Sequence, residues 1–221
     1  MGQNVGMAQL RSERGLDRLV NFSDATVAIA ITLLILPLVD AATHIGGEPF
    51  DAFYAKYQWE ILAFVVSFAV IARFWVVHHR IFESVRAYSS SLVWANFLWL
   101  FSIVIIPFTA NVLSNGSGQR TDINALYIGN LLLAAIASQL MGLVLVRHPG
   151  LMSEEARATR DRTSGIAELI LMAAALVLAT LVPAVGMFWL FLLFLAGPLH
   201  GLFRRVVYGP AAGRRASRTD S

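Results

Sequence analysis

Six apolar stretches, each long enough to cross a lipid bilayer, account for most of this sequence. A transmembrane helix needs about 20 mostly apolar residues to cross about 30 Å of hydrocarbon. Polar or turn-rich segments separate the six stretches. The sequence therefore predicts an all-α integral membrane protein with six transmembrane helices. The expected spans are residues 19–39, 59–82, 92–113, 123–146, 166–182 and 187–206.

The composition excludes several other classes of protein. The 221 residues are 57% hydrophobic and only 14% charged, whereas a soluble domain is about 45–50% apolar and about 25% charged. A chain of this length cannot bury that much apolar surface in one water-soluble core. The absence of cysteine excludes disulfides, thiolate metal sites and a cysteine nucleophile. A soluble enzyme, a disordered chain and a disulfide-rich secreted module are therefore excluded.

The basic residues predict the orientation of the chain. If the N-terminus is inside, 14 of the 17 lysines and arginines lie in inner segments, Lys56 and Arg120 lie outside, and Arg73 lies within the second span. This asymmetry places both termini in the cytoplasm of a multi-pass cell-membrane protein. Residues 1–18 are then a cytoplasmic N-terminal segment, residues 19–207 the six-helix transmembrane domain, and residues 208–221 a basic cytoplasmic tail. The tail is expected to meet anionic membrane lipid. No nucleic-acid partner is expected, because no folded basic face accompanies the tail.

The residues by themselves leave three function classes open, namely a channel, a secondary transporter and a membrane-embedded enzyme. No nucleophile–base pair, metal signature or phosphate loop supports an enzyme. No pair of broken helices or internal repeat supports a transporter. A conventional potassium channel is disfavoured too, since Thr-Val-Gly-Tyr-Gly is absent and no re-entrant segment separates the last two spans.

The first predicted helix has two different faces. Ala25, Ile29, Thr32 and Leu36 recur at a spacing that places them on one stripe. Asp24 lies about 140° away from Ile29. In a six-span protein such an apolar stripe is more often a lipid or packing surface than a pore lining. Periodicity alone therefore does not assign this face a function.

Motifs in the first three helices resemble those of the transmembrane protein 175 family. The first is Arg-x-x-x-Phe-Ser-Asp at 18–24, followed by Ala-x-x-Ala-Ile-Ala-Ile-Thr-Leu-Leu at 25–34. Phe-Trp-Val-Val-His-His-Arg-Ile-Phe at 74–82 and the third span at 92–108 agree with the same family. The last three spans match only in hydropathy and spacing. Members are potassium channels of animal endolysosomes and, in single-repeat form, of bacteria and archaea.

The resemblance implies a homotetramer in which the first helices of four chains line a central pore. Ile29 then matches the constricting isoleucine, Leu36 a second apolar ring, and Thr32 a threonine that takes part in cation selection. Four apolar side chains around an axis close a pore by dewetting. Potassium is the implied permeant ion, possible proton permeation stays open, and no cofactor or catalytic residue is expected. The alternative is a secondary transporter or another six-span membrane protein.

Polar residues near the cytoplasmic boundary predict a contact between helices. Asp24 and Arg73 lie at similar depth on different spans, and charged groups inside membranes usually face protein. We expect them to pair, with His78 or Asn96 completing the cluster. The alternative is that Arg73 extends to the inner interface. The resemblance implies a polar network around the Phe-Ser-Asp motif. Its expected members are Arg18, Phe22, Ser23, Asp24, Arg73, His78 and Asn96.

A metal site is a weaker interpretation of the histidines in the second span. His79 and Glu83 share a helical face, but only these two potential ligands align, and both lie at the membrane interface. Structural metal sites usually need more protein ligands than two. The sequence therefore favours an interfacial hydrogen-bonding role and predicts no metal.

Overall fold

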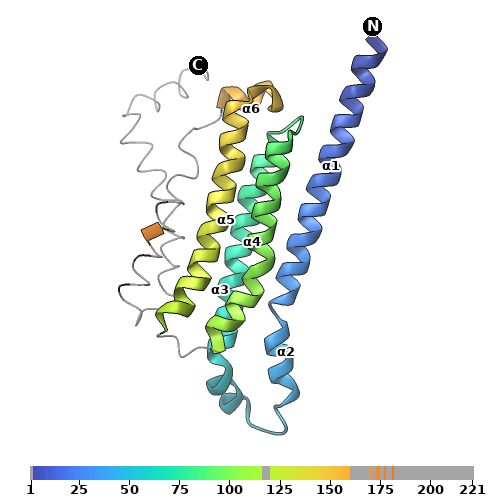
Figure 1. The fold of residues 1–221 in the computed structure, drawn as a ribbon. Helices are drawn as coiled ribbons and strands as arrows, with labels where there is room; N and C mark the ends of the chain where they lie inside the picture. The colour runs from blue at the N-terminus through green and yellow to red at the C-terminus, as the bar shows by residue number, and fades with distance from the viewer. Residues whose placement is uncertain are drawn as a thin grey trace, which may run out of the picture.

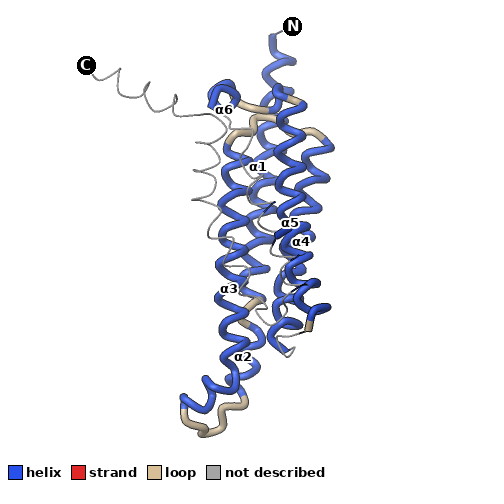
Figure 2. The backbone as a smooth tube through the Cα atoms, turned by 90° about the vertical axis from the view of Figure 1, so that its left-hand side faces the viewer, coloured by secondary structure: helices blue, strands red, loops and turns tan. Residues whose placement is uncertain are grey.

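The computed structural model describes residues 2–115 and 120–159, together with isolated positions at 170, 173, 174, 177 and 181. This part of the chain is helical, and its β-structure is one isolated bridge between Val85 and Met152. Figure 1 shows long helices side by side, and the view turned by 90° in Figure 2 shows them along one common axis. The elements are α1 (Gly2–Leu33), α2 (Leu36–Thr43), α3 (Phe50–Glu83), α4 (Ser90–Asn115), α5 (Thr121–Arg147), the short 3-10 helix η1 (Pro149–Leu151) and α6 (Glu154–Thr159).

Four segments are long and apolar enough to cross a membrane, which confirms the first four predicted spans. They are Arg14–Thr43, Phe50–Glu83, Ser90–Asn115 and Thr121–Arg147. Apart from the isolated positions, the predicted spans at 166–182 and 187–206 lie outside the described residues, as does the tail at 208–221. The helix predicted at 59–82 begins nine residues earlier, at Phe50, and the added part is set off by a kink at Tyr57, whose φ of −110° and ψ of 15° are not helical.

The first membrane segment is broken between α1 and α2 by a proline. Pro37 has no N–H to donate to the carbonyl of Leu33, so the α-helical hydrogen bond at this step is missing. The backbone tightens there, since Leu34 N donates to Ile31 O at 3.3 Å and Ile35 N to Thr32 O at 3.4 Å. Pro37 lies in the first turn of α2, where its fixed φ suits a helix start.

The turn between α2 and α3 depends on two glycines. Gly46 and Gly47 have φ values of 51° and 113°. Glycine adopts this left-handed region without the steric cost that a Cβ brings. Pro49 then precedes the first turn of α3, and Asp51 in that turn interacts favourably with the helix dipole. The turn lies at the opposite end of the molecule from α6 and the N-terminal end of α1 (Figure 1).

The core lies mainly between α3, α4 and α5, and α4 packs most extensively against α5. Large side chains there are almost completely buried. They include Ile71, Phe74, Trp99, Ile103, Ile106, Tyr127, Leu131 and Met141. Buried hydrogen bonds join the same helices, one between the hydroxyls of Tyr127 and Ser67 at 2.8 Å and one from Asn130 Nδ2 to Ser102 O at 3.0 Å. Helix α1 packs along one edge of this bundle, mostly on α4.

The N-terminal part of α1 contacts the loops at the α6 end of the bundle. Gly15 lies so close to Tyr88 that a Cβ at this position would collide with the tyrosine hydroxyl and ring. The loop that carries Tyr88 is joined to the loop after α5, because Arg86 N donates to Leu151 O at 2.8 Å and Ser153 N to Ser84 O at 3.0 Å. These contacts hold the α6 end of α1 against the bundle.

Candidate pore face and interhelical polar network

Helix α1 has one face packed on the bundle and one exposed face. The packed face carries Ser23, Val27, Ala30 and Leu34, all of them buried. All four residues of the predicted stripe are exposed, namely Ala25, Ile29, Thr32 and Leu36. Ile29 is 61% exposed and Leu36 55%. Neighbouring Ile31 is partly buried and packs against the core. The stripe is therefore an exposed, mostly apolar surface of this single chain, which suits a contact with lipid or with other copies.

The hydroxyl of Thr32 is oriented by its own helix. Its Oγ1 donates to the carbonyl of Ile29 at 2.8 Å. A threonine hydroxyl has one donor and two acceptor lone pairs. With the proton committed to the backbone, the oxygen presents acceptor capacity on the exposed face of α1. The carbonyl of Leu33, which Pro37 deprives of its helical hydrogen bond, lies one residue further on. The Thr32 hydroxyl is therefore an oxygen acceptor within the stripe.

A buried chain of hydrogen bonds joins α1, α4 and α3. Asn96 Nδ2 donates to Ser23 Oγ at 2.9 Å, and Asn96 Oδ1 lies 2.7 Å from His78 Nε2. Ser23 Oγ donates in turn to the carbonyl of Leu19 at 2.9 Å. The imidazole of His78 stacks on Trp99, with ring centroids 4.1 Å apart. The three polar side chains are almost completely buried, so each finds its partner inside the protein.

Asp24 has a partner that sequence reasoning missed. Its Oδ1 accepts a hydrogen bond from Trp75 Nε1 at 2.8 Å. The indole of Trp75 also stacks on His79, at 5.2 Å between centroids. An indole N–H is a donor without acceptor capacity, and a tryptophan at a helix interface usually satisfies it. The indole N–H of Trp75, which needs an acceptor, was therefore the sequence feature that could have pointed to this contact with Asp24. Arg73 is partly buried two residues earlier on α3, and its pairing with Asp24 stays a prediction.

Two other residues of the predicted network lie at its edge. Arg18 is exposed on α1. Phe22 is 53% exposed, and its ring meets Phe97 of α4 edge to face at 6.1 Å between centroids. The structure thus joins Ser23, His78 and Asn96 directly and places Phe22 in an aromatic contact beside them.

The histidines do not assemble a metal site in the part of the chain that the structure describes. His79 Nε2 lies 3.2 Å from Glu83 Oε1, and both side chains are about half exposed. No group of three or more His, Cys, Asp or Glu residues that could hold a metal ion occurs among the described residues. The pair is an interfacial contact within one turn of α3.

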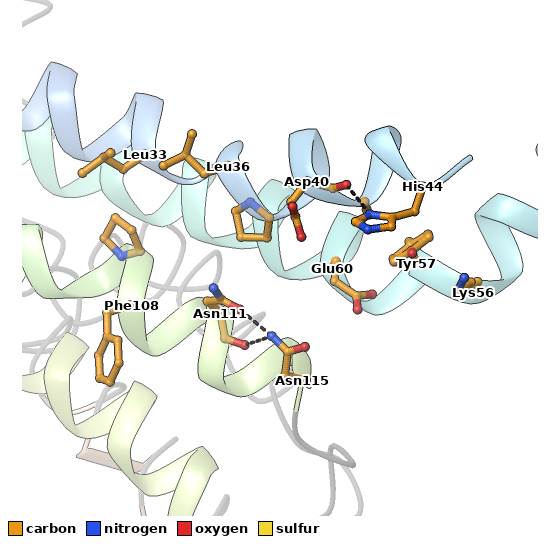
Figure 3. Close-up of a pocket in the computed structure, with 13 residues that line it drawn as sticks. Leu33, Leu36, Asp40, His44, Lys56, Tyr57, Glu60, Phe108, Asn111 and Asn115 are labelled. Atoms are coloured by element: carbon orange, nitrogen blue, oxygen red, sulfur yellow. Dashed lines mark hydrogen bonds between the residues drawn. The ribbon is translucent and has the colours of Figure 1, made fainter. Parts of the chain in front are cut away.

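A pocket of about 770 Å³ lies between α2, α3 and α4 near the α2–α3 turn. We call it the α2–α3 pocket (Figure 3). Leu36 of the stripe and Leu33 form part of its wall, and the rest is a mixture of polar and apolar side chains from all three helices. The lining residues are Leu33, Leu36, Pro37, Asp40, Ala41, His44, Lys56, Tyr57, Glu60, Pro107, Phe108, Asn111 and Asn115. The pocket therefore adjoins the exposed face of α1 and α2.

Comparison with known proteins identifies relatives of this chain. The family model described as endosomal/lysosomal potassium channel TMEM175 matches residues 18–107. "Potassium channel HX13_20290" of Chryseobacterium sp. (strain P1-3) is 26% identical over 78% of this chain and 88% of its own length. "Potassium channel B446_29190" of Streptomyces collinus is 33% identical over 66% of this chain and 74% of its own length.

A solved structure agrees with these sequence matches. It is the crystal structure of a lysosomal potassium-selective channel TMEM175 homolog from Chamaesiphon minutus. The two chains superpose with a TM-score of 0.66 and 26% sequence identity, over 83% of this chain and 95% of that one. The matched family region contains the polar network and the whole exposed stripe. From the family model, the Streptomyces relative and this fold, we conclude that the chain belongs to the TMEM175 family, a family of ion channels and not of enzymes.

Proposed function

We propose that this protein is a potassium channel whose pore is lined by α1 of four identical chains. The observation that carries the proposal is the exposed stripe of Ile29 and Thr32 on α1 and Leu36 at the start of α2, on a side of this segment that does not pack on the bundle. It lies within the region that matches the TMEM175 family model, and the relatives named above are described as potassium channels. In this proposal Ile29 and Leu36 form apolar rings and Thr32 contributes to the choice of ion.

We also propose the organisation of the whole chain. It crosses the cell membrane six times, with residues 19–207 as the channel domain and residues 1–18 and 208–221 in the cytoplasm. The four described membrane segments and the apolar stretches at 166–182 and 187–206 support this count. The excess of arginine in alternate segments supports the orientation. With that orientation the α2–α3 turn faces away from the cytoplasm.

Of the membrane segments that the structure describes, Arg14–Thr43 is the one that carries the exposed stripe, so we infer that assembly is needed to enclose a pore. Only 22% of the most apolar window of Arg14–Thr43 is buried, against 50% for Thr121–Arg147. Four copies related by a central axis would cover the exposed stripe with its own equivalents. We expect chemical cross-linking in mild detergent to give a product of four chains. A stable monomer that conducts ions would contradict this assembly.

The gate that we propose needs no separate moving plug. Four branched isoleucine side chains at one level exclude water when the ring is narrow, and an ion cannot leave its hydration shell there at low cost. When the ring widens, potassium passes as a partly hydrated ion. The oxygen of Thr32, one turn along the same stripe, then meets the ion with its lone pairs.

Ion selectivity tests this function. In liposomes that contain purified protein, the reversal potential under opposed potassium and sodium solutions should show a preference for potassium. Thr32→Ala should leave the pore conducting and reduce that preference, because it removes four acceptor oxygens from the pathway. Thr26→Ala is a matched control. Thr26 also donates to a carbonyl of α1, that of Phe22, but lies outside the stripe. Saturating transport without discrete conductance steps would instead indicate a secondary transporter.

A further inference from the structure

Two breaks in the helices border the same pocket. The first separates α1 from α2 at Leu34 and Ile35, just ahead of Pro37. The second is the kink of α3 at Tyr57, whose backbone angles are not helical. Pro37 and Tyr57 both line the α2–α3 pocket, so the two breaks lie beside one space. The segment between them, residues 36–57, contains α2, the turn and the first part of α3, and we call it the α2–α3 hairpin.

The positions of these breaks indicate a moving part. We propose that the α2–α3 hairpin is a hinged unit that turns about the two breaks and carries the Leu36 ring into and out of the proposed pore. Leu36 is the first residue of α2 and moves with the hairpin, whereas Ile29 lies on α1 and stays with the bundle. The Leu36 ring then opens and closes separately from the Ile29 ring. This inference deepens the proposed channel function and rests on it.

The α2–α3 hairpin packs less firmly than the rest of the membrane segments. Ala41 is the only buried residue in the range 36–57, all of which the structure describes. On α3 the buried residues begin at Ala63, after the kink. The hairpin also projects beyond the ends of α4 and α5 (Figure 1, Figure 2). A segment with few buried apolar contacts opens or moves at low cost in free energy.

The part of α1 next to the hairpin is fixed to the bundle. Asn96 donates a hydrogen bond to Ser23 at 2.9 Å, and Trp75 donates one to Asp24 at 2.8 Å. Leu34, at the break itself, is still buried. Tight packing therefore extends along α1 as far as the break and is largely absent beyond it. A hinge is expected at such a place, where a fixed element ends and a loosely held one begins.

The backbone at the first break offers little resistance to bending. Pro37 has no N–H for the carbonyl of Leu33. The hydrogen bonds donated by Leu34 and Ile35 are long, at 3.3 and 3.4 Å. Sharp bends in helices occur mostly where the ladder of backbone hydrogen bonds is interrupted in this way. Small rotations about a few backbone bonds would therefore swing the whole hairpin.

The α2–α3 pocket gives the hairpin space to move. The pocket has a volume of about 770 Å³ and lies between Asp40 of α2 and Asn111 of α4, which are on opposite walls (Figure 3). A close-packed interior would resist such a displacement, because it contains few voids larger than a water molecule. Leu36 belongs both to the pocket wall and to the pore stripe. Closure of the pocket would thus draw Leu36 toward α4 and away from the pore axis.

A disulfide across the pocket tests the motion, and the absence of cysteine from the chain makes the test specific. In the double variant Asp40→Cys with Asn111→Cys, a disulfide needs Cα atoms about 4.4–6.8 Å apart, so it forms only when α2 and α4 approach closely. We expect mild oxidation to form it within one chain and to raise potassium flux in liposomes about 3-fold or more, because Leu36 is then held off the axis. Reduction should restore the original flux. Failure of the disulfide to form within a chain, or an unchanged flux once it has formed, would overturn the proposal.

A cross-link inside the hairpin is the matched control. In Asp40→Cys with Lys56→Cys, both cysteines belong to the α2–α3 hairpin, one on each helix. A short thiol-reactive cross-linker between them joins the two helices but leaves both hinges free. The flux should therefore stay at the value of the same variant before cross-linking. A gain as large as that of the link between residues 40 and 111 would show that closure of the pocket is not the cause.

The rate of disulfide formation separates this inference from the channel function, because it is measured in detergent without any ion current. Pro37→Ala, added to the variant with cysteines at 40 and 111, restores the donor for the carbonyl of Leu33 and stiffens the first hinge. The gain of one backbone hydrogen bond predicts that the disulfide forms about 5-fold more slowly.

Pro49→Ala is the control for this rate. Pro49 directly precedes α3 in the turn, away from both breaks, so its replacement should leave the rate unchanged. Equal rates with and without Pro37→Ala would contradict the hinge, whether or not the parent conducts. Absence of current in the parent, together with a slower disulfide in Pro37→Ala, would contradict the channel function and leave the hinge in place.

Discussion

Ile29→Asn should raise potassium flux through the reconstituted protein about 10-fold or more, which corresponds to a barrier lower by about 1.4 kcal/mol. Ile29 is 61% exposed on the stripe that we assign to the pore. Asparagine has a similar size but binds water, so a ring of four would stay wet where four isoleucines exclude water. Flux and reversal potential measured in liposomes, at equal amounts of assembled protein, check this result.

Ile31→Asn is the matched control for the gate. Ile31 is the same residue type on the same helix, about 160° away by helical rotation. It is partly buried and packs against the core, so its replacement should lower stability without raising the flux per channel. Equal gains in flux at the two positions, or an unchanged flux in Ile29→Asn, would show that another face of α1 lines the pore.

Asn96→Ala should strongly reduce the stability of the folded and assembled protein. This change removes the donor to Ser23 Oγ on α1 and the partner of His78 on α3 at the same time, while Ser23 keeps its own bond to the carbonyl of Leu19. Each buried polar group left without a partner costs about 1–3 kcal/mol. Hydrogen bonds between membrane helices often contribute less, about 0.6–2 kcal/mol. Two hydrogen bonds are lost here at a site without solvent access, so we expect the loss of stability for each to lie in the upper part of about 0.6–2 kcal/mol. Melting temperature and the fraction of intact oligomer in detergent measure the effect.

Asn111→Ala provides the comparison for the network. Asn111 is an exposed asparagine on the same helix, and its side-chain oxygen accepts from the equally exposed Asn115. Its removal should change the melting temperature little, because water replaces the lost contact. If Asn96→Ala melts like Asn111→Ala, the buried network does not hold α1 against the bundle.

The polar network and the proposed gate are linked by the rotation of α1. Ser23 lies on the packed face, and Ile29, six residues further along, lies about 120° around the helix. The bond from Asn96 to Ser23 therefore sets which side chains of α1 face away from the bundle. Apolar packing by Val27 and Ala30 alone would specify this rotation less strictly, because lipid and protein offer similar surroundings to an apolar side chain. We infer that the network positions the gate.

Several features of the structure followed from the sequence alone. Hydropathy predicted the first four membrane segments, because each must supply about 20 apolar residues to the bilayer. The turn-rich residues between the first two spans predicted the loop where Gly46 and Gly47 adopt positive φ. The helical spacing of Ile29, Thr32 and Leu36 predicted that they share one face, and all three are exposed. These are local properties, fixed by backbone geometry and by the solvent that surrounds each segment.

Only the tertiary structure decided which side chains meet across helices. Trp75 binds Asp24 from 51 positions away, Tyr88 lies on Gly15, and Asp40, Glu60 and Asn115 surround one pocket. Each contact depends on the relative rotation and height of two or three helices. The hydropathy pattern leaves these quantities undetermined, because an apolar face packs equally well on lipid and on another helix. The sequence determined the spans and the composition of each face, while the packing of the helices determined the partners.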